Sequence, residues 1–488
     1  MHREATVALC ALAMLVGMAP MGAAGIMPDD PSQMDDDRRE ALQSTHPVHE
    51  YHTWETLTVD LQQLVSNNPG IARLHSAGES VMGLDLWYVE IANFRDENKT
   101  PLDQRETIYL DGGTHANEQL GTELAYEWAE FLIEGYGENE TATWIVDNRQ
   151  TVILPLVNPD GNHQDSRWNA NTVNINRNFP FGWAGVDENP VFNDPGPYPA
   201  SEPETQAVID VIDKYEPDYV NSFHTGIELM LYPWGFEERK PADDRMFNET
   251  CEAIGEDDPD FCGAVYDTIY PASGITIDYA YEHHGSAAWT YEVSNEQGLY
   301  ASTEDPRERM QRYWNGVEHA FLNVEKYGAH PILDGVRVDG DQVELTIENT
   351  GYGELDWADL TLQVPGAEDV ELEIGDLAPN ATTTLTATVP AEAAEDGRLS
   401  VDIHYPERKQ AQPMETRQVD LPVEVADGEL EASPLTEAAP DEATDSLDEP
   451  LDVASADEAD DGLTPVPGPG ALLATALLGL VAALAWRA

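Results

Sequence analysis

Basic residues are scarce in this sequence. Only 24 of 488 residues are Lys or Arg, and five of these are Lys, against 93 Asp and Glu, so the formal net charge is −69. A chain with this charge repels nucleic acid phosphates and anionic membrane surfaces, which argues against both as partners. Few Lys among many acids is also typical of halophilic proteins, because high salt screens surface charge almost completely.

Cysteine is scarcer still, with three residues. Cys10 lies in an apolar run that follows a short basic start and ends in small residues at Gly22-Ala-Ala-Gly25. This pattern predicts a signal peptide over residues 1–25, which signal peptidase removes on export. The mature chain then keeps Cys251 and Cys262. In an exported protein we expect them to form one disulfide that closes a short loop, with two free thiols as the alternative.

Long hydrophobic runs are absent between the two ends of the chain. The C-terminal run, Ala471 to Trp486, has sixteen residues, fewer than the roughly 20 needed to span a bilayer. Before it, Asp427 to Asp461 carries fourteen acids and no Lys or Arg, which predicts an acidic disordered stalk over residues 426–464. The end of the chain, residues 465–488, contains Pro-Gly-Pro-Gly and a terminal Arg-Ala.

Stalk, Pro-Gly motif, short apolar helix and Arg together resemble the C-terminal sorting tags that archaeosortases process. The resemblance implies anchoring at the cell surface, by the helix or by lipid after the helix is removed. The motif differs from the commoner Pro-Gly-Phe, and a plain tail anchor or a secreted form is the alternative. Four Asn-x-Thr sequons could carry glycan on an exported chain, at Asn98, Asn139, Asn248 and Asn380.

The middle of the chain, residues 46–328, alternates between two periodicities, after a polar segment at residues 26–45. Alternating and short apolar runs predict strands at Leu74–Ala77, Leu84–Ile91, Glu106–Leu110, Val152–Val157, Tyr219–Phe223 and Trp289–Val293. Helical spacing predicts helices over Leu57–Val65, Leu120–Phe131, Glu204–Lys214 and Thr303–Tyr327, and Asn158-Pro-Asp-Gly161 predicts a turn. Strands that alternate with helices indicate an α/β domain with a mixed, mostly parallel sheet flanked by helices.

Residues 330–425 have a different pattern of apolar and polar residues. Six short runs alternate apolar and polar residues, with Asn, Gly and Pro turns between them: Val336–Val338, Gln342–Ile347, Leu360–Val364, Val370–Ile374, Thr383–Val389 and Leu399–Ile403. This spacing is typical of an all-β immunoglobulin-like sandwich. No cluster of catalytic residue types lies there.

Three residues of the α/β domain could hold a metal. His115 and Glu118 lie three residues apart where a predicted strand becomes a helix, and His224 closes the Tyr219–Phe223 strand. Ligand sites in open α/β sheets sit at this carboxyl edge of the strands. Two imidazoles and one carboxylate form a zinc ligand set that leaves a fourth position for water. A solvated His and an acid at a helix start are the alternative for the first pair.

Two further features point to catalysis. Glu292 is an acid inside an apolar strand, where a buried unpaired carboxylate is costly, and near a zinc-bound water it would act as general base. Arg167 and Arg177 flank Asn176 in a Trp- and Asn-rich loop. In a chain so poor in cations they indicate anion binding, with pairing to nearby surface acids as the alternative.

These motifs resemble the zinc metallocarboxypeptidase family of the carboxypeptidase A type, over about residues 46–328. Gly113-Thr-His-Ala-Asn-Glu118 matches the His-x-x-Glu zinc motif, and Phe223-His-Thr-Gly226 contains the third ligand. The resemblance implies a Zn²⁺ enzyme that cuts the last peptide bond of peptides or proteins with a free C-terminus. It also implies the carboxypeptidase fold.

The resemblance assigns the remaining roles. Arg167 would polarise the scissile carbonyl and stabilise the oxyanion, while Asn176 and Arg177 would hold the terminal carboxylate. Tyr270, in Ile-Tyr-Pro-Ala-Ser-Gly, matches the mobile Tyr that closes over the substrate, and Glu292 follows it by 22 residues as the catalytic Glu.

The resemblance also concerns positions that contact the substrate and one that supports a zinc ligand. Ile277 matches the base of the pocket for the C-terminal side chain and implies a preference for apolar or aromatic residues. Asn174 stands where the family usually has an Asp behind the first zinc His, so we expect a weaker zinc site. Asn117 replaces a common substrate-binding Arg. The alternatives are a surface binding protein with a relic catalytic domain, or a relative that cuts cell-wall peptides or other amides.

Overall fold

The computed structural model describes residues 51–95, 101–102, 105–184, 194–254, 262–294, 306–339, 341–364, 366–390, 398–405 and 415–422. The predicted signal peptide, polar segment, acidic stalk and sorting tag lie outside these ranges, as does Asn98. Within them, no helix is long and apolar enough to cross a membrane.

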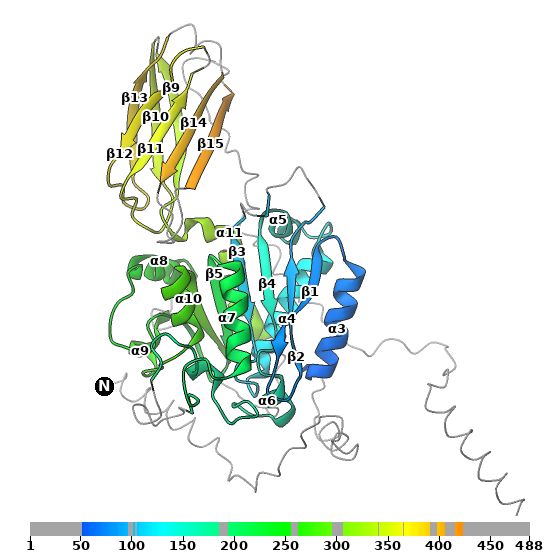
Figure 1. The fold of residues 1–488 in the computed structure, drawn as a ribbon. Coiled ribbons are helices and arrows are strands. Elements are labelled where there is room, and N and C mark those ends of the chain that lie inside the picture. Colours follow the sequence, from blue (N-terminus) through cyan, green and yellow to red (C-terminus); the bar gives the residue numbers. More distant parts are fainter. Residues whose placement is uncertain are drawn as a thin grey trace, which may run out of the picture. The chain divides into compact units, whose positions relative to one another are not determined.

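An eight-stranded mixed sheet forms the centre of the α/β region (Figure 1). The strand order is β1-β2-β4-β3-β5-β8-β6-β7. Four of the seven neighbouring pairs are parallel, and these include the pairs on both sides of β3 and the pair of β5 with β8. The mixed, mostly parallel sheet predicted from the alternation of elements is therefore confirmed. The strands are β1 (Ala72–Glu79), β2 (Asp85–Ile91), β3 (Thr107–Asp111), β4 (Gln150–Leu154), β5 (Tyr219–His224), β6 (Ile227–Tyr232), β7 (Cys262–Ala264) and β8 (Ala287–Ser294).

The helices flank this sheet (Figure 1). They are α3 (Trp54–Asn67), α4 (Gln119–Gly135), α5 (Glu140–Asn148), α6 (Pro159–Gln164), α7 (Pro203–Tyr215), α8 (Asp244–Ile254), α9 (Val265–Thr268), α10 (Thr276–His284) and α11 (Pro306–Asn323), with short 3-10 helices η3 (Ile175–Arg177) and η4 (Val324–Tyr327). Trp128 of α4 stacks on Trp314 of α11 at 3.7 Å between ring centroids. β3 and β5 are buried along their whole length, as strands covered on both faces should be.

Two local predictions need correction. The turn predicted at Asn158-Pro-Asp-Gly161 is the start of α6, because Asn158 acts as N-cap and its Oδ1 accepts from the backbone N of Gly161 at 2.9 Å. The helix predicted over Thr303–Tyr327 ends at Asn323 and continues as η4.

The C-terminal strands form two antiparallel sheets, of three strands in the order β13-β10-β9 and of four in the order β12-β11-β14-β15. A shared hydrophobic core lies between them, with Leu345 and Ile347 of one sheet and Leu360, Leu362 and Ile403 of the other. Two sheets that share a core form a sandwich, as the alternating pattern predicts. The strands are β9 (Pro331–Asp339), β10 (Gln342–Asn349), β11 (Ala358–Gln363), β12 (Val370–Ile374), β13 (Thr382–Thr388), β14 (Arg398–Tyr405) and β15 (Glu415–Pro422).

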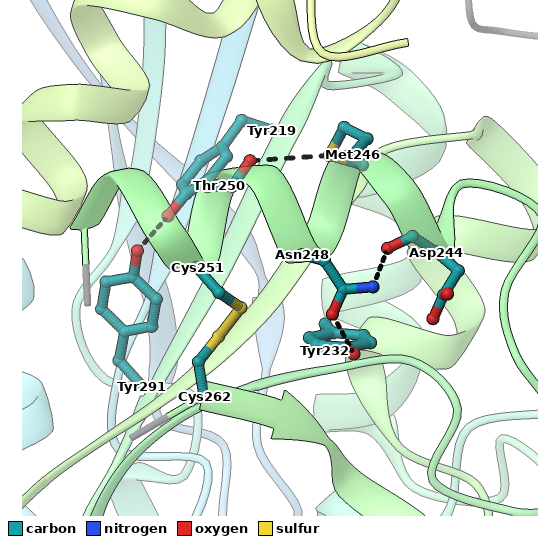
Figure 2. The surroundings of a disulfide bond; sticks show 9 residues. All are labelled: Tyr219, Tyr232, Asp244, Met246, Asn248, Thr250, Cys251, Cys262 and Tyr291. Atoms are coloured by element: carbon teal, nitrogen blue, oxygen red, sulfur yellow. Dashed lines mark hydrogen bonds between the residues drawn. A yellow bond between two sulfur atoms is a disulfide. The ribbon is translucent and has the colours of Figure 1, made fainter. Parts of the chain in front are cut away.

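Figure 2 shows a disulfide between Cys251 of α8 and Cys262 of β7, with an S–S distance of 1.98 Å. It joins residues 11 apart in sequence. Because β7 pairs with β6, the cross-link ties α8 to the edge of the sheet. Asn248, one of the sequon residues, donates from Nδ2 to the carbonyl of Asp244 on the same helix (Figure 2).

Candidate active site

The turn after β3 carries the first two candidate ligands. Gly113 has φ +63°, a conformation that favours glycine, and a Cβ on Gly112 would clash with the carbonyl oxygen of Gly121. The turn therefore packs directly on the first turn of α4. Glu118 is the N-cap of α4 but makes no side-chain cap. Its carboxylate instead faces His115.

His224 reaches the same point from the neighbouring strand. A Cβ on Gly121 would lie 2.6 Å from the carbonyl oxygen of Phe223, so α4 lies directly against the end of β5. The Nδ1 atom of His224 is 3.0 Å from Nδ1 of His115 and 2.9 Å from Oε2 of Glu118. Nδ1 of His115 is 3.0 Å from Oε1 of Glu118.

The three side chains form a site that suits a cation. Zinc bonds of about 2.0–2.1 Å in tetrahedral geometry place two ligand atoms about 3.3 Å apart, close to the spacings found here. Two imidazole lone pairs and a carboxylate cannot share so small a buried space without a proton or metal ion between them. His115, Glu118 and His224 are all buried, and they are the group within the described part of the chain whose donor types and spacing fit a metal. The predicted zinc ligand set is therefore brought together.

The charges within this group shift the pKa of each of its members. Burial and the nearby Arg167 lower the pKa of His115 to about 3, so its imidazole is neutral and available as a ligand. Burial alone would raise the pKa of Glu118, but the two imidazoles outweigh burial and lower it well below the usual value. Burial likewise opposes the charge on His224, yet Glu118 holds the pKa of His224 above its ordinary value.

Each imidazole has a partner on its other nitrogen. Nε2 of His115 faces Oδ1 of Asn174 at 3.0 Å, so the amide takes the place predicted for it. Nε2 of His224 lies 3.2 Å from Oγ of Ser222, and that hydroxyl donates to Oδ1 of Asp111 at 2.6 Å. Burial raises the pKa of Asp111 to about 6, although the hydrogen bond from Ser222 by itself would lower this pKa. Such partners fix the tautomer and orientation of ligand imidazoles.

Arg167 and Glu292 border the same group. Nη1 of Arg167 lies 2.7 Å from Oε1 of Glu118. Glu292 in β8 is the register partner of His224 in β5, and its Oε2 is buried without a hydrogen-bond partner among the described residues. Burial and the charge of Glu118 raise the pKa of Glu292 to about 7. A carboxylate with such a pKa can accept and return a proton near neutral pH.

The predicted carboxylate-binding residues form a second group. Arg177 is buried, which lowers its guanidinium pKa, and it donates from Nη2 to the hydroxyl of Tyr270 at 3.4 Å. Asn176 is held in place because its Oδ1 accepts from the backbone N of Thr276 at 3.0 Å, and its Nδ2 lies 3.3 Å from Nε2 of His224. Ile277, at the start of α10, has no exposed surface.

Sequence reasoning missed Asp111, Ser222 and Thr276. Ser222 precedes His224 by two residues on a strand, so both side chains face one side of the sheet. That spacing is a usable signal. The pairing of Asp111 with Ser222 depends on the register between β3 and β5, which the sequence does not reveal.

Comparison with known proteins gives a consistent assignment. The sequence pattern of the zinc carboxypeptidase family matches residues 57–317, more than half of the chain. Carboxypeptidase B of Bos taurus is 25% identical over 283 residues, covering 52% of this chain and 65% of the relative. Carboxypeptidase A1 of Sus scrofa is 27% identical over 278 residues, covering 51% and 64%. The chain thus spans just under two thirds of the length of these relatives.

Among solved structures, thrombin activatable fibrinolysis inhibitor is similar in fold, with a TM-score of 0.50 at 19% identity, over 56% of this chain and 74% of that one. The chain belongs to the zinc carboxypeptidase family.

Proposed function

We propose that this member of the zinc carboxypeptidase family removes C-terminal residues from peptides or proteins by hydrolysis. The observation that carries the proposal is the convergence of His115, Glu118 and His224 beside Glu292, whose Oε2 has no hydrogen-bond partner among the described residues. A buried carboxylate oxygen without a partner is costly, and a reacting water is the partner that this chemistry supplies.

His115, Glu118 and His224 would hold the zinc ion through Nδ1, a carboxylate oxygen and Nδ1. When bound, zinc supplies Lewis-acid polarisation of the scissile carbonyl and lowers the pKa of a water molecule. Glu292 accepts the proton of the attacking water and delivers it to the leaving amine. Arg167 lies beside the ligand carboxylate and donates hydrogen bonds to the oxyanion that develops.

Recognition of a free C-terminus would come from Arg177 and Tyr270. A guanidinium suits a carboxylate because its N–H groups form a planar fork. Arg177 is buried with its Nη2 on the Tyr270 hydroxyl, so the pair is already held together. Asn176 is fixed by Thr276 and supports the same wall of the site. Recognition of the free terminal carboxylate would make the enzyme an exopeptidase.

Two peptides that differ only at the C-terminus test whether the free carboxylate is recognised. A peptide with a free carboxylate should be trimmed by the zinc-loaded protein, while its C-terminal amide should be cut at least about 100-fold more slowly, since about 3 kcal/mol of charge-assisted bonding is lost. Removal of zinc with a chelator should abolish trimming, and added zinc should restore it. Equal cleavage of both peptides would favour a relative that cuts other amides. Zinc binding without hydrolysis of either would favour a surface binding protein with a relic site.

We further propose a preference for apolar or aromatic C-terminal residues. Its support is that position 277 carries Ile, which cannot pair with a substrate cation. Ile277→Asp should shift the preference toward Lys and Arg, measured as kcat/KM on peptides ending in Phe, Leu or Arg. Because Ile277 is fully buried, the melting temperature of the variant must be followed in parallel. Peptides ending in Arg that are cut as fast as those ending in Phe by the unchanged protein would contradict the proposal.

The cellular setting is a separate proposal. The sequence supports export with removal of residues 1–25, a catalytic region over 46–328, a sandwich over 330–425, and surface anchoring through residues 465–488 after an acidic stalk. An archaeosortase would process the last segment. Mass spectrometry of the protein from its own cells tests this, since the tag should be missing from the anchored form. An intact C-terminus on that form would instead support a plain tail anchor.

The sequons offer glycan sites to different degrees. Asn380 is exposed at a turn with φ +58°. Asn139 is half-buried, and its Oδ1 caps α5 by accepting from the backbone N of Ala142, so its side chain is held in the cap. If the chain is glycosylated, we expect Asn380 to carry glycan before Asn139.

A further inference from the structure

Asp111 is a buried carboxylate that the proposed mechanism does not use. It has no exposed surface, and within the described residues its Oδ2 has no hydrogen-bond partner. Its Oδ1 accepts a 2.6 Å hydrogen bond from the hydroxyl of Ser222. The Tyr109 hydroxyl is a further polar neighbour of this carboxylate. Burial of a charge with so few partners is unfavourable for folding alone, which points to a role for an acid at this position.

The geometry connects this carboxylate to a candidate zinc ligand. β3 and β5 are parallel, and their register sets Asp111 opposite Ser222. Ser222 and His224 are two residues apart on β5 and so face the same side of the sheet. Oγ of Ser222 lies 3.2 Å from Nε2 of His224.

The direction of the hydrogen bonds follows from the donor types. With Nδ1 of His224 turned to the other ligands, its Nε2 carries the ring proton and needs an acceptor. Among the described residues, two side-chain polar atoms lie within reach, Oγ of Ser222 and Nδ2 of Asn176, and the amide nitrogen can only donate. The Asn176 oxygen is occupied by Thr276. Ser222 therefore accepts a hydrogen bond from His224 and donates its own to Asp111.

The other ligand imidazole has weaker support. Nε2 of His115 donates to the neutral amide oxygen of Asn174 at 3.0 Å, which orients the ring without adding charge. A negative charge that raises the basicity of a ligand imidazole therefore lies on the His224 side of the site. It is the charge of Asp111, and the hydroxyl of Ser222 lies between it and the imidazole.

We propose that Asp111 and Ser222 are positioning residues of the zinc site, which orient His224 and raise its metal affinity through an imidazole–hydroxyl–carboxylate chain. This inference rests on the proposed zinc-binding function. It adds that Asp111, through the hydroxyl of Ser222, supplies the negative charge that the neutral amide of Asn174 lacks. Loss of either residue weakens zinc binding itself, beyond any loss of fold stability.

The experiment measures the zinc Kd by competition with a chelator, on the full chain, for Ser222→Ala and Asp111→Asn. Asp111→Asn keeps the shape and an acceptor oxygen but removes the charge. The matched control is Ser286→Ala, which removes another fully buried serine hydroxyl, one that donates to the carbonyl of Pro217 at 2.7 Å at the opposite end of β8 from Glu292. The melting temperature of each metal-free variant is recorded alongside.

We expect Ser222→Ala to raise the zinc Kd about 10- to 100-fold and Asp111→Asn to raise it at least several-fold, by analogy with other partners of metal-ligand imidazoles. Ser286→Ala should lower the melting temperature and leave the zinc Kd unchanged. The absorption spectrum of bound Co²⁺ should also shift in Ser222→Ala, because the ligand ring is free to turn.

A zinc Kd within about twofold of the unchanged protein in both site variants would overturn the inference, whatever their stability. If Ser222→Ala does not fold, the isosteric Asp111→Asn decides alone. Hydrolysis is scored separately on the unchanged protein. Zinc binding without hydrolysis there would refute the proposed function and leave this inference standing.

Discussion

The pairing of His52 with two acids makes the stability of the fold depend on pH. His52 lies just before α3, and its Nδ1 is 2.7 Å from Oε2 of Glu123 in α4, while its Nε2 is 3.2 Å from Oδ2 of Asp60. Burial alone would lower the pKa of His52, but the charge and hydrogen bond of Glu123, with Asp60, outweigh burial and raise the pKa to about 9. The side chain of His52 is 15% exposed, so solvent screens the pair little.

The size of the effect follows from the shift. A folded pKa of about 9 against 6.5 in the unfolded chain favours the protonated, folded state by about 3 kcal/mol at low pH. This stabilisation is fully present below pH 6.5 and is lost as pH rises through 9. About 2.5 kcal/mol of it is present at pH 7 and gone at pH 10.

Urea unfolding at fixed salt and zinc, from pH 6 to pH 10, tests this value. The free energy of unfolding of the unchanged protein minus that of His52→Gln should fall by about 2.5 kcal/mol between pH 7 and pH 10. A double-mutant cycle with Glu123→Gln should show coupling at pH 7 and none at pH 10. Parallel curves for the unchanged protein and His52→Gln would refute the reasoning, since general repulsion between acids affects both proteins alike.

Three further predictions concern the zinc site, the packing of α4 against β5, and the disulfide. Asn174→Asp should tighten zinc binding about 10-fold in a chelator titration, and unchanged affinity would count against the role of this amide. Gly121→Ala should cost about 1–3 kcal/mol in urea unfolding and raise the zinc Kd, because the new methyl would lie 2.6 Å from a carbonyl oxygen of β5. Gly375→Ala, where a Cβ meets nothing within 4 Å, is the control and should change neither. Replacing both Cys251 and Cys262 by Ser should lower the free energy of unfolding by up to about 3 kcal/mol, as expected for closure of a short loop, with activity of the folded protein retained.

The parts of the fold that could be predicted are those that depend on local pattern. β3, β4, β5 and β8 are short apolar runs because both faces of a central strand are covered, and that composition is visible in the sequence. The His115–Glu118 spacing likewise predicts convergence, because it spans a single strand-to-helix turn. The scarcity of cations drew attention to Arg167, and the resemblance to a known family then supplied its role and identified Tyr270, which no periodicity would have done.

The parts that could not be predicted depend on contacts between distant segments. α10 begins at Thr276 without a side-chain cap, so the sequence carries no local signal for its start. The backbone N of Thr276 is instead held by Asn176, which lies a hundred residues earlier in the chain. The link from Asp111 to Ser222 arises only from strand register. Ile277, which the resemblance assigns to the base of a pocket, is fully buried at the start of α10, and its role in specificity stays a prediction.

The most direct test of the central claim is a single substitution measured in two ways. Glu292→Gln preserves the shape of the side chain but cannot take the proton of the attacking water. We expect the variant to bind zinc as the unchanged protein does, measured by metal analysis, and to lose at least about 1,000-fold in turnover of a peptide with a free C-terminus. Retained turnover with zinc bound would contradict the assignment of Glu292 and the mechanism built on it.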